Sequence, residues 1–126
     1  MTMETTTAYV IFPDGFRVEA EVAATGAARA RGLMFRDSLD ERAGMVFPFD
    51  VPGRYPFWMK NVRIPLDILW LDAGGRVVWI VERAEPCTSE PCPMYVPGAE
   101  ASYVVEVIGG FAAKHGVAVG DAVTLR

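Results

Sequence analysis

Two carboxylates fall within apolar runs, where an acid is either paired or chemically active. Asp67 lies in the run Leu66 to Asp72, and strand alternation places it on the same face as Leu69 and Leu71. A carboxylate on an apolar face is hydrogen-bonded, ion-paired or shifted in pKa. Asp67 is therefore the candidate catalytic residue, as a general acid or base. The alternative is a structural acid that holds a loop amide or an arginine. Asp72 is an odd number of residues away, so the two acids form no dyad on one strand face.

Glu106 is the second candidate for an enclosed carboxylate, because it lies between Val105 and Val107 in a strand-like run. The same alternatives apply to it. It either contacts a ligand or holds part of the structure together.

Large aromatic and polar residues adjoin in the segment Phe57-Trp58-Met59-Lys60-Asn61. In a strand, Trp58 and Lys60 point to one side and the other three residues to the opposite side. Aromatic surface with a few convergent polar groups is typical of small-ligand sites. The same pattern occurs where a core strand meets its rim, so the segment alone leaves both interpretations open.

The two cysteines, Cys87 and Cys92, lie in a segment with three prolines. Two thiols cannot complete a tetrahedral zinc site. Their spacing is wider than the C-x-x-C of redox enzymes, so it favours a structural disulfide, which in so short a loop contributes roughly 2 kcal/mol. In a reducing cytoplasm the same pair would be thiols or a redox-sensitive clasp.

The usual catalytic and cofactor motifs are missing from the sequence. His115 is the single histidine, which excludes a multi-histidine zinc site and an H-E-x-x-H metalloprotease. There is no G-x-S-x-G, P-loop or G-x-G-x-x-G motif. Methionine is usually flexible core filler, so Met34, Met45 and Met59 do not indicate a metal. We therefore expect no metal and no cofactor.

Length and charge further limit the kind of protein this sequence can encode. The 126 residues fit one domain, residues 1–126, and the net charge of −4 disfavours nucleic acid as a partner. No run reaches the ~20 apolar residues of a membrane span. Residues 1–7 are polar, which predicts a flexible tail. They do not show the basic-then-apolar order of a signal peptide. This indicates a cytoplasmic protein as written, or a periplasmic or extracellular one if a leader has been removed.

The elements that position these residues are mostly strands. Thr25 can cap a main helix over residues 26–36, and a short helix is expected near residues 110–115. Strand patterns occupy residues 8–12, 17–22, 45–49, 56–60, 66–71, 76–83 and 102–108, and residues 119–125 form a turn that leads into a closing strand. This order predicts a mostly-β α+β domain, an antiparallel barrel or strongly bent sheet with one main and one short helix.

Several of these strings together resemble the domain-of-unknown-function 192 family, also called uncharacterised protein family 0127, of bacteria and archaea. The matching strings begin with RGLMFR at residues 31–36, GMVF at 44–47, FWMKN at 57–61 and IPLDI at 64–68. The proline-flanked cysteines, YVVE at residues 103–106 and the Gly-Asp pair at 120–121 complete the order. The resemblance spans residues 16–125 and implies one compact domain without an established activity. It also implies which polar residues matter: Arg31, Arg36, Lys60, Asn61, Asp67 and Glu106.

Three hypotheses for function follow. The first is a binding module, in which a groove between the main helix and the FWMKN and IPLDI segments holds a small polar ligand, a glycan or peptide fragment; its candidate ligand-binding residues are Arg31, Arg36, Trp58, Lys60, Asn61, Asp67 and Glu106. The second is a scaffold in which these charges form an internal lattice and the surface meets a protein partner. The third is a hydrolase or lyase with Asp67 as general acid or base and Lys60 or Arg31 stabilising negative charge.

Overall fold

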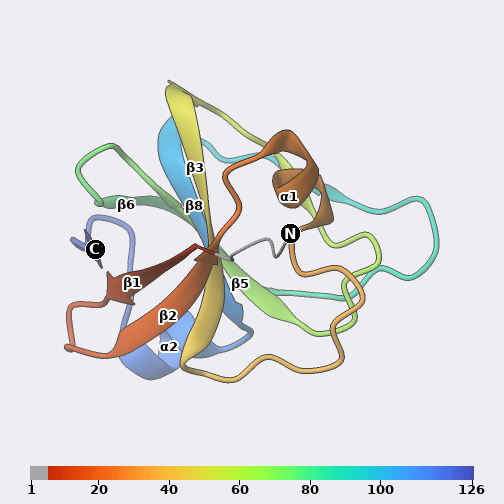
Figure 1. Cartoon of the computed structure of the whole chain (residues 1–126), viewed down its shortest axis with the longest axis horizontal. Helices are drawn as coiled ribbons and strands as arrows, with labels where there is room; N and C mark the ends of the chain where they lie inside the picture. The colour runs from red at the N-terminus through yellow and green to blue at the C-terminus, as the bar shows by residue number, and fades with distance from the viewer. Residues whose placement is uncertain (1–5) are drawn as a thin grey trace, which may run out of the picture.

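The computed structural model describes residues 6–126 (Figure 1). Residues 1–5 of the predicted flexible tail lie outside the described residues. The rest of that segment is bound to the sheet, because Thr7 begins strand β1 (Thr7–Ile11) and the Val22 N–H donates to the Thr6 carbonyl at 2.8 Å.

Within the described residues, seven strands form one strongly curled sheet in the order β6-β5-β8-β3-β2-β1-β9. Besides β1 they are β2 (Arg17–Val22), β3 (Ala43–Gly53), β5 (Leu66–Leu71), β6 (Val77–Ala84), β8 (Ala101–Ile108) and β9 (Thr124–Leu125). The predicted mostly-β, bent-sheet architecture is confirmed as a half-barrel. The two outer edges meet at one end, where the Val77 N–H donates to the Asp121 carbonyl and the Gly120 N–H to the Val77 carbonyl, both at 2.8 Å.

One strand pair departs from the predicted antiparallel pattern. Strands β2 and β3 run parallel, with Glu19 opposite Ala43 and Val22 opposite Val46. A parallel pair needs a long crossover, which is supplied here by the chain between the two strands and its helix α1 (Gly26–Arg31). The crossover places α1 beside the sheet rather than at its end.

The prediction of one main helix is not confirmed, since α1 has six residues and α2 (Phe111–His115) has five. Thr25 caps α1 as expected, accepting from the Ala28 N–H at 3.0 Å. The helix stops early because Gly32 takes a left-handed φ of 48° and its N–H closes the last turn on the Ala28 carbonyl. A second short sheet, β4 (Phe57–Trp58) with β7 (Met94–Tyr95), was not predicted as a pair.

The sheet separates two hydrophobic cores. Leu66, Ile68 and Trp70 of the fully buried strand β5 face one core, whereas Leu69 and Leu71 face the other. The helices lie on opposite sides of the sheet (Figure 1), with α2 in the core of Leu69 and Leu71 and α1 against the other. Both faces of β5 and β8 are therefore covered, and any acid on these strands is enclosed.

Candidate functional site

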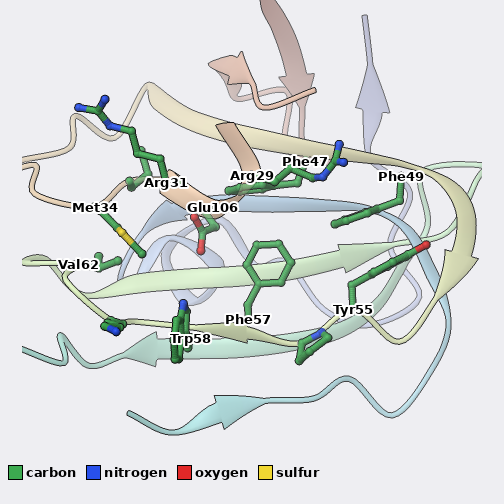
Figure 2. Close-up of a pocket in the computed structure, with 15 residues that line it drawn as sticks. Arg29, Arg31, Met34, Phe47, Phe49, Tyr55, Phe57, Trp58, Val62 and Glu106 are labelled. Atoms are coloured by element: carbon green, nitrogen blue, oxygen red, sulfur yellow. The ribbon is translucent and has the colours of Figure 1, made fainter. Parts of the chain in front are cut away.

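A pocket of about 280 Å³ lies between α1 and the segment that carries β4 (Figure 2). Its walls are aromatic, with Phe49 and Tyr55 at one end and Met34 and Val62 at the other. The aromatic rings hold one another in fixed orientations. Phe49 stacks on Tyr55 with ring centroids 3.8 Å apart, and Phe57 meets Phe47 edge-to-face at 4.9 Å. The pocket therefore offers rigid, flat apolar surfaces to a ligand.

Glu106 is the buried acid of this pocket. It lies on β8 opposite Ile68 of β5 and Met45 of β3, and 3% of its surface is exposed. Figure 2 shows its carboxyl pointing into the pocket, to one side of the Phe57 ring. Within residues 6–126 no protein group forms a hydrogen bond or ion pair with this carboxyl, whose oxygens border the pocket space.

Burial raises the pKa of Glu106 from 4.5 to about 8. At neutral pH the carboxyl is therefore mostly protonated, so it can donate one hydrogen bond as well as accept. The carboxyl oxygens border the pocket space, so a group bound in the pocket can reach them.

Three cationic side chains line the same pocket. Arg29 and Arg31 come from α1, and Lys60 follows β4. The Arg29 guanidinium lies over the ring of Phe49 at 5.5 Å from its centroid and donates to the Ala24 carbonyl at 2.9 Å. Arg31 extends outward from the rim (Figure 2). The Lys60 Nζ lies over the ring of Trp58, 5.2 Å from its centroid, and 2.5 Å from the Glu90 Oε1.

The predicted disulfide between Cys87 and Cys92 is confirmed, and it supports the β4 side of the pocket. The Asn61 N–H donates to the Cys87 carbonyl at 2.9 Å, and the Cys87 N–H donates to the Met59 carbonyl at 3.2 Å. Glu90, the partner of Lys60, lies within the disulfide loop. The loop thus fixes the backbone beside Lys60 and supplies the carboxylate of Glu90 that pairs with the lysine.

Four of the predicted ligand-binding residues, Arg31, Trp58, Lys60 and Glu106, line this one pocket. Arg36 and Asn61 do not line it. Arg36 forms a bidentate ion pair with Glu21. Asn61 has a left-handed φ of 59°, and its carbonyl accepts from the Phe35 N–H at 2.8 Å.

Asp67 lies on the opposite face of the sheet, fully buried and away from the pocket. Its Oδ1 accepts from the Arg83 N–H at 2.8 Å and the Gly110 N–H at 3.0 Å. Its Oδ2 accepts from the Ala112 N–H at 2.7 Å. Two of these donors belong to the first turn of α2, so Asp67 supplies the cap that Gly110 cannot provide.

Sequence reasoning missed most of the pocket wall. Arg29, Phe47, Phe49 and Tyr55 were not selected as site residues, although all of them line the pocket. The available signal was the density of aromatic residues between positions 47 and 58, of which only Trp58 was selected as a binding residue.

The part of the chain that the structure describes contains no helix long and apolar enough to cross a membrane. In residues 6–126 there is also no group of three or more histidine, cysteine and acidic side chains arranged to hold a metal ion.

Comparison with known proteins identifies relatives of this fold. A family model for DUF192, described as Uncharacterized ACR, matches residues 9–125. A protein of unknown function from Novosphingobium aromaticivorans DSM 12444 is 34% identical, with a TM-score of 0.82 over 95% of this chain and 84% of that one. A Sinorhizobium meliloti 1021 protein provisionally named a transcription regulator is 26% identical, with a TM-score of 0.87 over 99% and 98% of the two chains. No curated protein matches significantly.

Proposed function

The chain belongs to the DUF192 family of uncharacterised proteins, and we propose that it is a binding module for a small polar ligand, a glycan or peptide fragment. The ligand would occupy the pocket between α1 and β4. The observation that carries this proposal is the Glu106 carboxyl, which is buried, points into the pocket and has no partner among the described residues. Because its oxygens border the pocket space, a ligand in the pocket can form hydrogen bonds with them.

The surrounding side chains support the same function. Rigid aromatic walls provide apolar contact, and a few polar groups fix orientation, as in most small-molecule sites. The partly exposed ring of Trp58 lines the pocket, and the Lys60 Nζ lies over it. By contrast, both oxygens of Asp67 are already engaged by backbone N–H groups, so no observation favours a hydrolase or lyase built on that residue.

A thermal-shift panel of glycans, peptidoglycan fragments, short peptides and amino acids tests the proposal. A ligand at 100 times its Kd stabilises the folded state by about 2.7 kcal/mol, which raises Tm by roughly 3–6 °C for a domain of this size. We expect at least one compound to produce this shift in the wild-type chain.

Two tryptophans provide a matched pair of variants. Trp58 is 39% exposed and lines the pocket, whereas Trp79 is 40% exposed and does not line it. Trp58→Ala is expected to abolish the ligand-induced shift, and Trp79→Ala is expected to keep it. A flat panel on a well-folded chain would instead support the scaffold hypothesis, in which the surface binds a protein partner. An unchanged shift in Trp58→Ala would place the ligand outside the pocket.

A further inference from the structure

The pocket differs in charge from the rest of the molecule. The chain carries a net charge of −4, yet Arg29, Arg31 and Lys60 all line this one cavity. Nearby cations outside the pocket are neutralised, since Arg36 pairs with Glu21 and Arg63 pairs with Asp37.

The three cations of the pocket differ in whether an acidic side chain pairs with them. Lys60 pairs with Glu90, but within residues 6–126 no acidic side chain pairs with Arg29 or Arg31. Glu106 is largely neutral at pH 7 because of its burial, so it does not offset them. The pocket consequently presents excess positive charge in a largely apolar enclosure, which favours an anion over a cation.

Glu106 adds a second requirement on the ligand. A protonated carboxyl donates one hydrogen bond and accepts others, and a hydroxyl group meets both demands at once. The flat rings of Phe57 and Trp58 set a third requirement on the ligand. They match the apolar C–H face of a sugar ring better than they match a flexible chain. The volume of about 280 Å³ suits one such ring.

Resting on the proposed function, these three observations lead us to infer that the pocket selects a sugar acid, a single hydroxylated ring that carries one carboxylate. Its hydroxyl groups bind Glu106, its ring packs on the aromatic wall, and its carboxylate faces Arg29. Arg31 adds positive potential at the rim. Glu106 and Arg29 are then the residues that determine specificity.

The inference is tested by titrating the chain with D-glucuronate and with D-glucose, which differ mainly in the carboxylate, using isothermal titration calorimetry. We expect glucuronate to bind at least tenfold more tightly than glucose. Arg29→Gln should weaken glucuronate binding about tenfold or more and weaken glucose binding much less. Arg31→Gln should have a smaller effect in the same direction. Arg63→Gln, which removes a cation outside the pocket, is the matched control and should change neither.

The pH dependence tests the role of Glu106. The other titratable groups that line the pocket are Arg29 and Arg31 from α1, and Tyr55 and Lys60 from the segment around β4. The glucuronate carboxylate stays ionised between pH 7 and 9. If the anion requires the protonated acid, a pKa of about 8 predicts roughly tenfold weaker binding at pH 9 than at pH 7. Glu106→Gln stays neutral, so its binding should not weaken in this way.

The outcomes separate this inference from the proposed function. If neutral glycans or peptides bind through Trp58 and glucuronate does not, the sugar-acid assignment is overturned while the binding module stands. If glucuronate binds more tightly at pH 9 in the wild-type chain, contact with a neutral Glu106 is wrong. If no compound binds and the chain is folded, both proposals fail together.

Discussion

Asp67 and Glu106 are two acids on neighbouring strands with nearly equal burial and opposite surroundings. Asp67 is 0% exposed and Glu106 is 3% exposed. Asp67 accepts hydrogen bonds from three backbone N–H groups, whereas Glu106 accepts none from the described residues. Burial alone therefore does not distinguish a structural acid from one available to a ligand. The partners of the carboxyl group do.

The difference follows from what covers each face of the sheet. On the side of Asp67, α2 begins directly over the carboxylate and presents its unpaired N–H groups to it. On the side of Glu106, α1 ends at Gly32, and aromatic side chains rather than backbone donors surround the acid. Asp67 thus caps the first turn of α2, whereas the Glu106 carboxyl has no protein partner among the described residues.

The largest effect is expected for Asp67→Ala. This change leaves the N–H groups of Arg83, Gly110 and Ala112 buried without an acceptor, so we expect a loss of about 3–5 kcal/mol in the free energy of unfolding. Chemical denaturation measures it. Asp72→Ala is the control, because Asp72 accepts from the N–H groups of Gly74 and Arg76 in a solvated turn and should cost only about 1 kcal/mol. Equal costs for both variants would contradict the structural role of Asp67.

The next effect has the opposite sign and concerns Glu106→Gln. The folded protein holds a proton on Glu106 up to a pKa of about 8, whereas the unfolded chain releases it near 4.5. Between these values the folded state binds more protons than the unfolded chain. The contribution of Glu106 to the free energy of unfolding therefore falls as pH rises from 4.5 to 8, and it is constant outside that window. The neutral glutamine removes this loss. We expect roughly 2–4 kcal/mol of stabilisation at pH 7 and almost none at pH 4.5.

Denaturation of wild type and Glu106→Gln at pH 4.5, 6, 7 and 8 measures this difference. The proposed difference between the two acids would be wrong if Glu106→Gln destabilised the chain at every pH. Glu106 would then be a structural residue with its hydrogen bonds formed, like Asp67.

The sequence could identify both acids, but it could not separate them. Each lies within an apolar strand pattern, and both are buried as predicted. The donors to Asp67 that begin α2 lie 43 and 45 residues further along the chain, so only the folded sheet brings them together. The assignment of Asp67 as the candidate acid or base came from burial, which the two residues share.

The fold was predictable where local patterns decide it. Alternation located residues 17–22, and an apolar, aromatic run bounded by Pro and Gly located residues 66–71, with the bounds of β2 and β5. The pattern failed where one residue overrides its neighbours: Gly32 ends α1 within a segment that reads as helix, and the left-handed Phe35 follows it. The pocket wall could not be derived because residues 29–34, 47–62 and 106 meet only through the parallel crossover and the curl of the sheet.

A smaller effect is expected when the disulfide on the pocket side is removed. The double variant Cys87→Ser, Cys92→Ser frees a short loop, which should cost about 2 kcal/mol. Thermal unfolding with and without a reductant measures the loss, and the double variant itself should be insensitive to reductant. If reduction of the wild-type chain leaves Tm unchanged, the loop is held by its backbone bonds to Met59 and Asn61 alone.

The smallest effect on stability is expected for Glu90→Gln. Its ion pair with Lys60 is solvent-exposed, and such pairs contribute little to folding, so Tm should not change measurably. The lysine is then unpaired beside the pocket, and binding of glucuronate should tighten about twofold at low salt and return to the wild-type value near 0.5 M salt. Arg63→Gln serves again as the control outside the pocket. A clear fall in Tm without a change in affinity would show that the Glu90 carboxylate, like Asp67, stabilises the fold. The expected result would show that Glu90, like Glu106, affects ligand binding instead.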